Sequence, residues 1–315
     1  MLDRPWVVTG AAGYLGSHVT EQLLSRGIPV VAVDNFSGGR REYLEPHRDN
    51  PRFKLEELDI RDSSALTARF QRYQPTAVVH LAALHFIPAA IADPPLAVSL
   101  NVHGTQCVLS AARAVNAQSV WFASTGDVYA PGEAPHKEEQ ECSPFNIYGL
   151  TKFIGEQLIA LESRIRPDAH FFVGRLFNLY GPRETNPHIL PEILSQVKLD
   201  RTKALRLGNM WPRRDLVPVV DAARAVIEST LAAPTGVSTM NVATGVAISM
   251  AEVVNEISRA LGGGLKVETD PAKVRPVERN HLQADVSRLR GLIGWSPHGD
   301  IKRGIRELLA YEQIS

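Results

Sequence analysis

The sequence predicts an α/β protein in which a doubly wound parallel sheet is followed by a smaller C-terminal α/β domain. Three observations lead to this prediction. Through the first half of the chain, short apolar runs alternate with helical patterns, as in parallel strands joined by crossover helices. The apolar runs contain no polar alternation, so the strands are expected to be buried on both faces. After about Phe177 the alternation breaks, and prolines interrupt the chain at positions 182, 187, 191, 212 and 218.

The elements of the first half follow from these runs in order. Strands are expected at residues 6–8, 30–33, 53–55, 77–79, 120–123 and 170–173. The first helix, Tyr14–Arg26, presents one apolar face and ends at Gly27. Further helices are expected at about 63–72 and 96–115, and around Tyr148 and Lys152.

The second half has a less regular path. Helices are expected at residues 189–197, 221–231, 250–261 and about 301–311. We expect residues 1–176, with about 216–243, to form the first domain. Residues from about 177 to 215, with 244–315, would form the second domain.

Composition excludes several classes of protein. Among the 315 residues, 34 Lys and Arg balance 34 Asp and Glu, whereas binding to nucleic acid or a membrane surface calls for a basic excess. Two cysteines, Cys107 and Cys142, supply neither a disulfide framework nor the spacing of a metal site. Neither a signal peptide nor an apolar run long enough to span a membrane is recognised. We therefore expect a cytoplasmic protein without a metal.

A glycine-rich turn follows the first expected strand and opens the first helix. It reads Thr9-Gly10-Ala11-Ala12-Gly13-Tyr14-Leu15-Gly16. Glycines let the backbone approach a pyrophosphate, which binds at the N-terminus of the helix. In this context the turn predicts a Rossmann-type dinucleotide site, and a plain tight turn is the alternative. The residues expected to contact the cofactor are Gly10, Gly13, Tyr14, Leu15 and Gly16.

Asp34 ends the second expected strand and bears on which dinucleotide would bind. A carboxylate there can accept both hydroxyls of the adenine ribose and repels a 2′-phosphate, which favours NAD over NADP. Arg40 and Arg41 lie nearby and either oppose this preference or are solvated loop charges. Residues after the third and fourth strands would hold the adenine and line the cofactor with small side chains. They are Asp59, Ile60, Leu81, Ala82 and Ala83.

Tyr148 and Lys152 are four residues apart and therefore share one face of a helix. A phenol is a poor base at neutral pH, but an ammonium one turn away favours the phenolate and lowers its pKa. Such a pair can take a proton from a sugar or alcohol hydroxyl. Taken alone, the spacing also fits an exposed helix face.

Further motifs accompany the glycine turn and the Tyr148–Lys152 pair. They are Asp34–Gly38, His80–Ala83, Asn101–Thr105, Ser124–Tyr129, Arg175–Pro182 and Arg214-Asp215. With these motifs in order, nearly the whole chain resembles the extended short-chain dehydrogenase/reductase family. The resemblance is to its nucleotide-sugar epimerase and dehydratase branch, of the UDP-glucose 4-epimerase type.

The resemblance implies roles for particular residues. Tyr148 would be the general base, Thr125 would hydrogen-bond the oxidised sugar hydroxyl, and Lys152 would also bind the nicotinamide ribose. Further cofactor contacts would come from Asn35, Ser37, Gly38, Asn101 and Ser124. The nucleotide-diphosphate sugar would be contacted by His85, Asp127, Asn178, Arg214 and Arg275. A homodimer through the helices at 96–115 and 144–164 is also implied.

Several reactions of this branch begin with hydride transfer from carbon 4 of the sugar to NAD. Dehydratases typically carry Asp-Glu after the threonine, whereas this chain has Gly126-Asp127. Gly126 has no side chain that could protonate a leaving hydroxyl, so epimerisation at carbon 4 is favoured. Asp127 leaves a dehydratase or decarboxylase open, although it could also serve only a local hydrogen bond. A 4-keto-sugar reductase is a further alternative, although such enzymes usually use NADPH and Asp34 speaks against it. A non-catalytic NAD-sensing protein is a remote alternative, because such proteins usually lose the tyrosine or the lysine and this chain keeps both.

Overall fold

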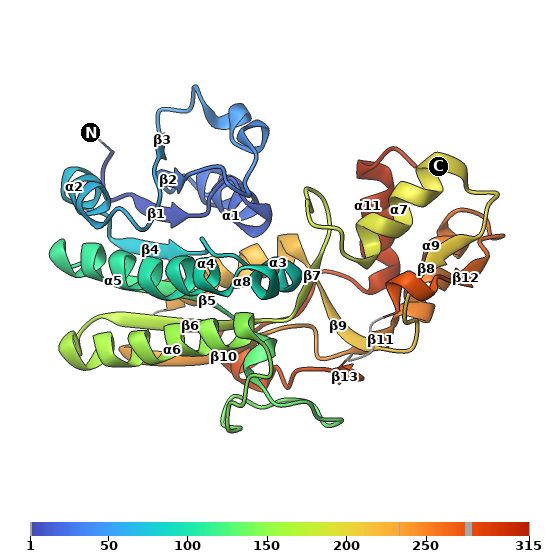
Figure 1. Cartoon of the computed structure of the whole chain (residues 1–315). Helices are drawn as coiled ribbons and strands as arrows, with labels where there is room; N and C mark the ends of the chain where they lie inside the picture. The colour runs from blue at the N-terminus through green and yellow to red at the C-terminus, as the bar shows by residue number, and fades with distance from the viewer. Residues whose placement is uncertain (1, 233, 275–278, 315) are drawn as a thin grey trace.

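The computed structural model describes residues 2–232, 234–274 and 279–314. The chain forms two lobes (Figure 1): a long twisted parallel sheet with helices on both faces, and a smaller lobe of helices around short strands. The helices of the smaller lobe are α7 (Ile189–Asp200), α9 (Met250–Ala260) and α11 (Ile301–Tyr311).

The large sheet has the order β10-β6-β5-β4-β1-β2-β3, and its neighbouring strands pair in parallel throughout. The predicted doubly wound parallel sheet is thus confirmed. Its strands are β1 (Trp6–Thr9), β2 (Val30–Asp34), β3 (Phe53–Glu57), β4 (Ala77–His80), β5 (Ser119–Thr125), β6 (His170–Leu176) and β10 (Gly236–Val242).

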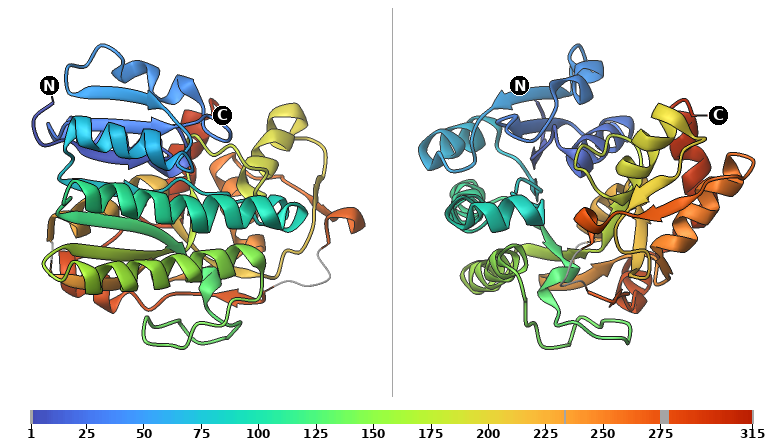
Figure 2. Two further views of the ribbon diagram at one scale, coloured as in Figure 1. Left: turned by 60° about the vertical axis from the view of Figure 1, so that its left-hand side comes forward. Right: turned by 45° about the vertical axis from the view of Figure 1, so that its right-hand side comes forward.

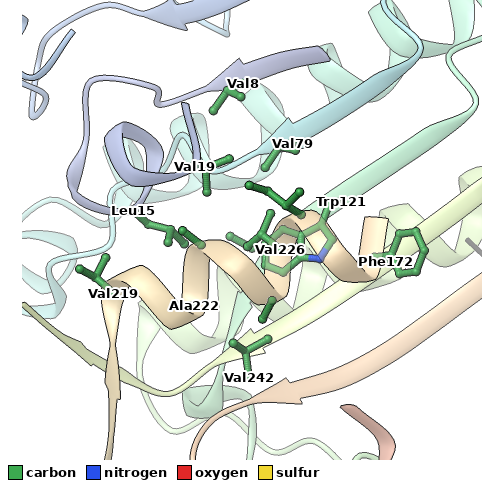
Figure 3. Packing of buried hydrophobic residues seen from close by; sticks show 14 of the residues in the cluster. Val8, Leu15, Val19, Val79, Trp121, Phe172, Val219, Ala222, Val226 and Val242 are labelled. Carbon is green, nitrogen blue, oxygen red and sulfur yellow. The ribbon is translucent and has the colours of Figure 1, made fainter. Parts of the chain in front are cut away.

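Successive side chains of each strand point to opposite faces of the sheet, where they pack in two separate hydrophobic cores. Val8 packs with α1 (Tyr14–Ser25), α8 (Val219–Ala232) and α10 (Ser287–Ile293) on one face. Figure 3 shows this core, where Leu15 and Val19 of α1 and Val226 of α8 meet Val79, Trp121 and Phe172 of the sheet. The other face is covered by α2 (Ser63–Tyr73), α5 (Thr105–Ala114) and α6 (Ile147–Ile165). Figure 2 shows α5 and α6 side by side across that face. Each buried Val or Leu contributes about 1.5–3 kcal/mol to folding.

Two expectations about these elements were wrong in detail. β3 lies at the edge of the sheet, and only Phe53 in it is buried, because an edge strand has a single neighbour and its outer side meets water. The expected helix at 96–115 is a continuous helical run made of α4 (Pro94–Val98), a π-helical turn η3 (Ser99–Gly104) and α5. Such turns are frequent at functional sites, because they turn a side chain to a new direction.

The smaller lobe has two sheets of short strands that the sequence did not indicate. One has the order β11-β9-β13, with β7 also paired to β9, and the other joins β8 to β12. The strands are β7 (Asn178–Tyr180), β8 (Leu205–Leu207), β9 (Arg213–Pro218), β11 (Ala247–Ser249), β12 (Val267–Thr269) and β13 (His281–Leu282). Asp215, fully buried in β9, accepts hydrogen bonds from the amides of Thr244, Gly245 and Ala284 and so holds the crossing strands together.

We propose that the two lobes are the two domains expected from the sequence. α8 and β10 return to the large sheet, and the expected boundary near residue 216 falls within β9. The remaining short elements are α3 (Ile87–Ala92), η1 (Arg41–Tyr43), η2 (Glu45–His47), η4 (Gly126–Val128) and η5 (Pro271–Lys273). Within the described part of the chain, no helix is long and apolar enough to cross a membrane.

Candidate active site

The glycine-rich turn lies at the carboxyl end of β1, which pairs with β2 on one side and β4 on the other. Gly10 has φ +69°, and a Cβ atom on it would lie 2.7 Å from the amide nitrogen of Ala82. A Cβ on Gly16 would lie 2.0 Å from the carbonyl oxygen of Gly10. Gly13 caps α1 without a side-chain hydrogen bond, so the first amides of the helix can bind an anion. This cradle fits the pyrophosphate of a dinucleotide.

Asp34 fixes the loop beside the cradle. Its carboxylate oxygens accept hydrogen bonds from the amides of Ala12 and Phe36, each at 2.8 Å. Burial raises the pKa of Asp34, and these amide bonds oppose that rise. Each carboxylate oxygen has more than one lone pair, so the group can still accept a ribose hydroxyl.

The loop after β2 brings other predicted cofactor residues together. Asn35 accepts hydrogen bonds from the amide and hydroxyl of Ser37 and donates one to Asp59 at 3.1 Å. Gly38 is exposed beside them. Arg41 pairs with Glu57, so this arginine has an acidic partner on the exposed side of the loop.

The ends of β3 and β4 supply the other wall. Arg61 donates to both oxygens of Asp59, at 2.6 and 2.9 Å, and lowers the pKa of that carboxyl to about 2. Ile60 is buried, and a Cβ on Gly104 would lie 2.5 Å from its Cδ1 atom. Leu81, Ala82 and Ala83 are half-buried after β4.

Asn101, also expected to contact the cofactor, has a side chain that is buried in η3 and hydrogen-bonded to protein groups. Its amide nitrogen donates to the Leu84 carbonyl at 3.1 Å and to the Thr151 hydroxyl at 2.9 Å. Its amide oxygen accepts from the Leu84 amide at 2.8 Å. Asn101 therefore holds the loop after β4 against α6.

Ser124 also faces the interior, where it donates a hydrogen bond to Glu156. Glu156 forms a buried ion pair with Arg175, which donates from Nε to Oε1 at 3.0 Å and from Nη2 to Oε2 at 2.7 Å. Arg175 also donates to the Tyr129 hydroxyl at 2.9 Å. This network lies directly beneath Thr125, and the motif Arg175–Pro182 gave no indication of it.

Thr125, Tyr148 and Lys152 are brought together by the end of β5 and the first turns of α6. Asn146 caps α6 by accepting from the Gly149 amide at 2.8 Å. A Cβ on Gly149 would lie 2.4 Å from the Asp127 carbonyl oxygen, so the helix packs closely on η4. The Thr125 side chain lies close enough to the Tyr148 phenol to act on the pKa of that phenol. Tyr148 is half-buried, as suits a group that reaches a substrate, whereas Lys152 is buried.

The electrostatics of this pair differ from the expectation. Desolvation and the charge of Asp127 raise the pKa of Tyr148 well above its ordinary value, and the Thr125 hydrogen bond only partly opposes them. Burial lowers the pKa of Lys152 to about 7. The expected lowering of the tyrosine pKa by the lysine was wrong for the protein alone, because spacing on a helix does not reveal how far both groups are desolvated.

The predicted substrate residues come from both lobes. His85, in the loop after β4, lies 2.7 Å from the side-chain nitrogen of Asn186, which follows β7. Asn178 is exposed in β7, and Arg214 lies in β9 beside Leu282 of β13. Arg275 lies outside the described residues.

Arg279 is a residue that the sequence interpretation missed. Its guanidinium donates to the carbonyl oxygens of Gly126, at 3.3 Å, and Tyr129, at 2.6 Å. It lies 4.0 Å from the Asp127 carboxylate. A cavity of about 380 Å³ adjoins it, lined in part by Phe145 and His281. Its place four residues after Arg275, a predicted substrate residue, is the one signal in the sequence that could have drawn attention to it.

Comparisons with known proteins found relatives that match along nearly the whole chain. Residues 7–308 match the family model described as GDP-mannose 4,6 dehydratase. The UDP-glucose 4-epimerase of Mycolicibacterium smegmatis is 30% identical over 310 residues, which cover 97% of each chain. The solved UDP-glucose 4-epimerase of Thermus thermophilus in complex with NAD is 27% identical, with a TM-score of 0.85 over 98% of this chain and 99% of that one. The UDP-N-acetylglucosamine 4-epimerase of Methanobrevibacter ruminantium has 25% identity and a TM-score of 0.89, over 99% of both chains.

Proposed function

Because the chain belongs to the extended short-chain dehydrogenase/reductase family, in its nucleotide-sugar epimerase and dehydratase branch, we propose that it is an NAD-dependent nucleotide-sugar 4-epimerase. The observation that carries this proposal is the meeting of Thr125, Tyr148 and Lys152 at the edge of the sheet that also holds the glycine cradle. The relatives named for UDP sugars support a UDP-linked hexose as substrate.

In this proposal the cofactor is held by the chain's own backbone and one carboxylate. The amides at the start of α1 bind the pyrophosphate, and Asp34 accepts the hydroxyls of the adenine ribose. Bound NAD supplies the reversible uptake of a hydride, which converts carbon 4 to a ketone and back.

The protein residues handle the proton and the orientation of the sugar. Tyr148 takes the proton of the 4-hydroxyl as the hydride leaves and returns it when the hydride comes back. Thr125 fixes the hydroxyl by hydrogen bonding. Lys152, charged in part near neutral pH because burial lowers its pKa to about 7, stabilises the phenolate when protonated. Arg214 binds the diphosphate, and Arg275 is proposed as its partner.

Gly126 favours epimerisation over dehydration. It offers no group that could protonate a leaving hydroxyl, and a Cβ there would lie 3.3 Å from the Phe177 ring. Asp127 favours a second candidate, a dehydratase or decarboxylase, because its carboxylate is close enough to Tyr148 to raise the tyrosine pKa.

Product analysis separates these reactions. Purified protein is incubated with UDP-glucose, UDP-N-acetylglucosamine and UDP-glucuronic acid without added cofactor, and products are identified by mass and NMR. We expect an isomer of unchanged mass. Loss of water would indicate a dehydratase, loss of carbon dioxide a decarboxylase, and turnover only with NADPH a reductase.

Tyr148→Phe tests the assignment of the base. We expect turnover to fall by about 10²–10⁴-fold, the usual contribution of general base catalysis, while NAD binding is retained. Tyr311→Phe, on the exposed side of α11, serves as the control and should keep full turnover. Full activity in Tyr148→Phe would contradict the proposed mechanism.

We also propose that the protein is a homodimer through the helical face that contains α6. Apolar side chains on this face are exposed, namely Ile91, Val98, Leu150, Leu161 and Ile165. Burying them against a second copy would stabilise the pair by the hydrophobic effect. Sedimentation velocity should give twice the mass of one chain, and Leu161→Glu should give monomers. A monomeric wild type would contradict the proposal.

A further inference from the structure

Arg279 reaches from the smaller lobe to the turn that carries Thr125. The residue is only 6% exposed, and its guanidinium lies 4.9 Å from the centre of the Phe145 ring. Phe145 directly precedes Asn146, the cap of the helix that bears Tyr148. Arg279 thus touches both elements that meet at the active site.

The hydrogen bonds of Arg279 fix the conformation of this turn. The acceptors are the carbonyls of Gly126 and Tyr129, the first residue of η4 and the residue that caps its end. Thr125 caps the beginning of η4 by accepting from the Asp127 amide at 3.2 Å. One buried guanidinium therefore holds the turn whose capping residue, Thr125, is proposed to orient the sugar hydroxyl.

The charge of Arg279 opposes that of Asp127. The carboxylate of Asp127 raises the pKa of Tyr148, which disfavours the phenolate that the reaction needs. Arg279 lies 4.0 Å from that carboxylate. Burial lowers the pKa of Arg279, and the charge of Asp127 opposes this lowering. Asp127 still raises the pKa of Tyr148 with Arg279 in place, so the guanidinium offsets only a part of the field of that carboxylate at Tyr148. Other charged or titratable groups around the pair are Lys152 of α6, Arg214 of β9, His80 at the end of β4 and His85 in the next loop.

We propose that Arg279 is a positioning residue of this active site, which holds the turn that carries Thr125 and offsets the charge of Asp127, so that Tyr148 can accept a proton. The inference rests on the proposed function, because it assigns Tyr148 as the base. It also gives a role to the buried charge of Arg279, which within the described residues makes no ion pair shorter than 4.0 Å.

The test is a double-variant cycle in which the pH dependence of kcat/KM is measured for each variant. With Arg279→Gln the Asp127 charge is no longer offset, so the pKa of Tyr148 rises. The acidic limb of the kcat/KM profile should then move up by about one pH unit. Asp127→Asn should move it down. The double variant Asp127→Asn/Arg279→Gln should lie near the wild type. Arg303→Gln, on the exposed face of α11, is the control and should not move the limb.

A conservative variant separates charge from geometry. Arg279→Lys keeps the charge but replaces the planar fork, whose two nitrogens bond the two carbonyls, with a single nitrogen, so kcat should fall while the acidic limb stays in place. If Arg279→Gln does not fold, as thermal unfolding would show, Asp127→Asn alone must still move the limb down. An unmoved limb in both single variants, or a double variant that keeps the full shift of Arg279→Gln, would overturn the proposal.

A second readout does not depend on turnover. Difluorotyrosine, which has a lower pKa than tyrosine, is placed at position 148 of the NAD-bound protein and titrated by ¹⁹F NMR. The same order of pKa values is expected: Arg279→Gln highest, Asp127→Asn lowest. If the wild type epimerises no nucleotide sugar, the proposed function fails, and this titration still decides whether Arg279 offsets Asp127. Equal values in all variants would overturn the inference.

Discussion

Replacing Glu156 with glutamine removes the charge that pairs with Arg175 beneath the active site. The two side chains are each 6% exposed and are joined by two hydrogen bonds. Breaking a buried pair from one side leaves an uncompensated charge and costs about 3–5 kcal/mol. Arg175 retains the Tyr129 hydroxyl and the Glu138 carbonyl as partners, so the lower end, about 3 kcal/mol, is expected. That is a large part of a typical stability of about 5–15 kcal/mol.

Equilibrium unfolding in urea, followed by circular dichroism and tryptophan fluorescence, measures this cost. Glu156→Gln/Arg175→Met removes both charges and should recover most of the loss, because no charge is left buried. Glu307→Gln, which breaks the exposed pair with Arg303, is the matched control and should cost less than about 1 kcal/mol. A loss below about 1 kcal/mol in Glu156→Gln would refute the reasoning that the pair is desolvated.

Two other predictions concern the cradle and the buried lysine. Gly10→Ala should weaken NAD binding at least about tenfold in calorimetry, because the residue has φ +69° and its Cβ would meet backbone at 2.7 Å. Gly291→Ala is the control, because a Cβ atom at Gly291 would meet no neighbouring atom within 4 Å, and it should bind NAD as the wild type does. Equal affinities of the wild type and both variants would contradict the expected strain at Gly10. Burial lowers the pKa of Lys152 to about 7, so the unfolded chain binds more protons between there and its ordinary value of about 10.4. Without NAD, the free energy of unfolding of the wild type should therefore rise over that pH interval, whereas that of Lys152→Met should not. Below pH 7 the variant should be the more stable protein. If urea titrations give parallel curves of stability against pH for the two proteins, the lysine is not desolvated.

The fold was predictable because its signals are local. Apolar runs that lack alternation identified the buried strands, and glycines between a strand and a helix identified the cradle. The edge position of β3 was not predictable in this way, because it depends on strand order rather than on the run itself. The π-helical turn around Asn101 was missed as well, since its residues read as ordinary helix.

The residues of the candidate site likewise divide into those that local sequence patterns predicted and those that they did not. Tyr148 and Lys152 were found by their spacing on one helix, and Thr125 by its motif. Asn101 and Ser124 were predicted as cofactor contacts from their motifs, which did not indicate that their side chains bond to Leu84, Thr151 and Glu156. A motif fixes which residue is present, whereas the direction of its side chain depends on the elements packed around it.

The sequence by itself determined the parallel sheet, the glycine-rich turn, Asp34 at the end of β2 and the tyrosine–lysine pair, because each depends on neighbours a few residues apart. Only the tertiary structure placed Arg279 on Gly126, a contact between residues 153 apart in the chain. It also decided the protonation of the pair, raising the pKa of Tyr148 and lowering that of Lys152. The physical reason is that burial and the field of distant charges are properties of the packed protein, to which every element contributes.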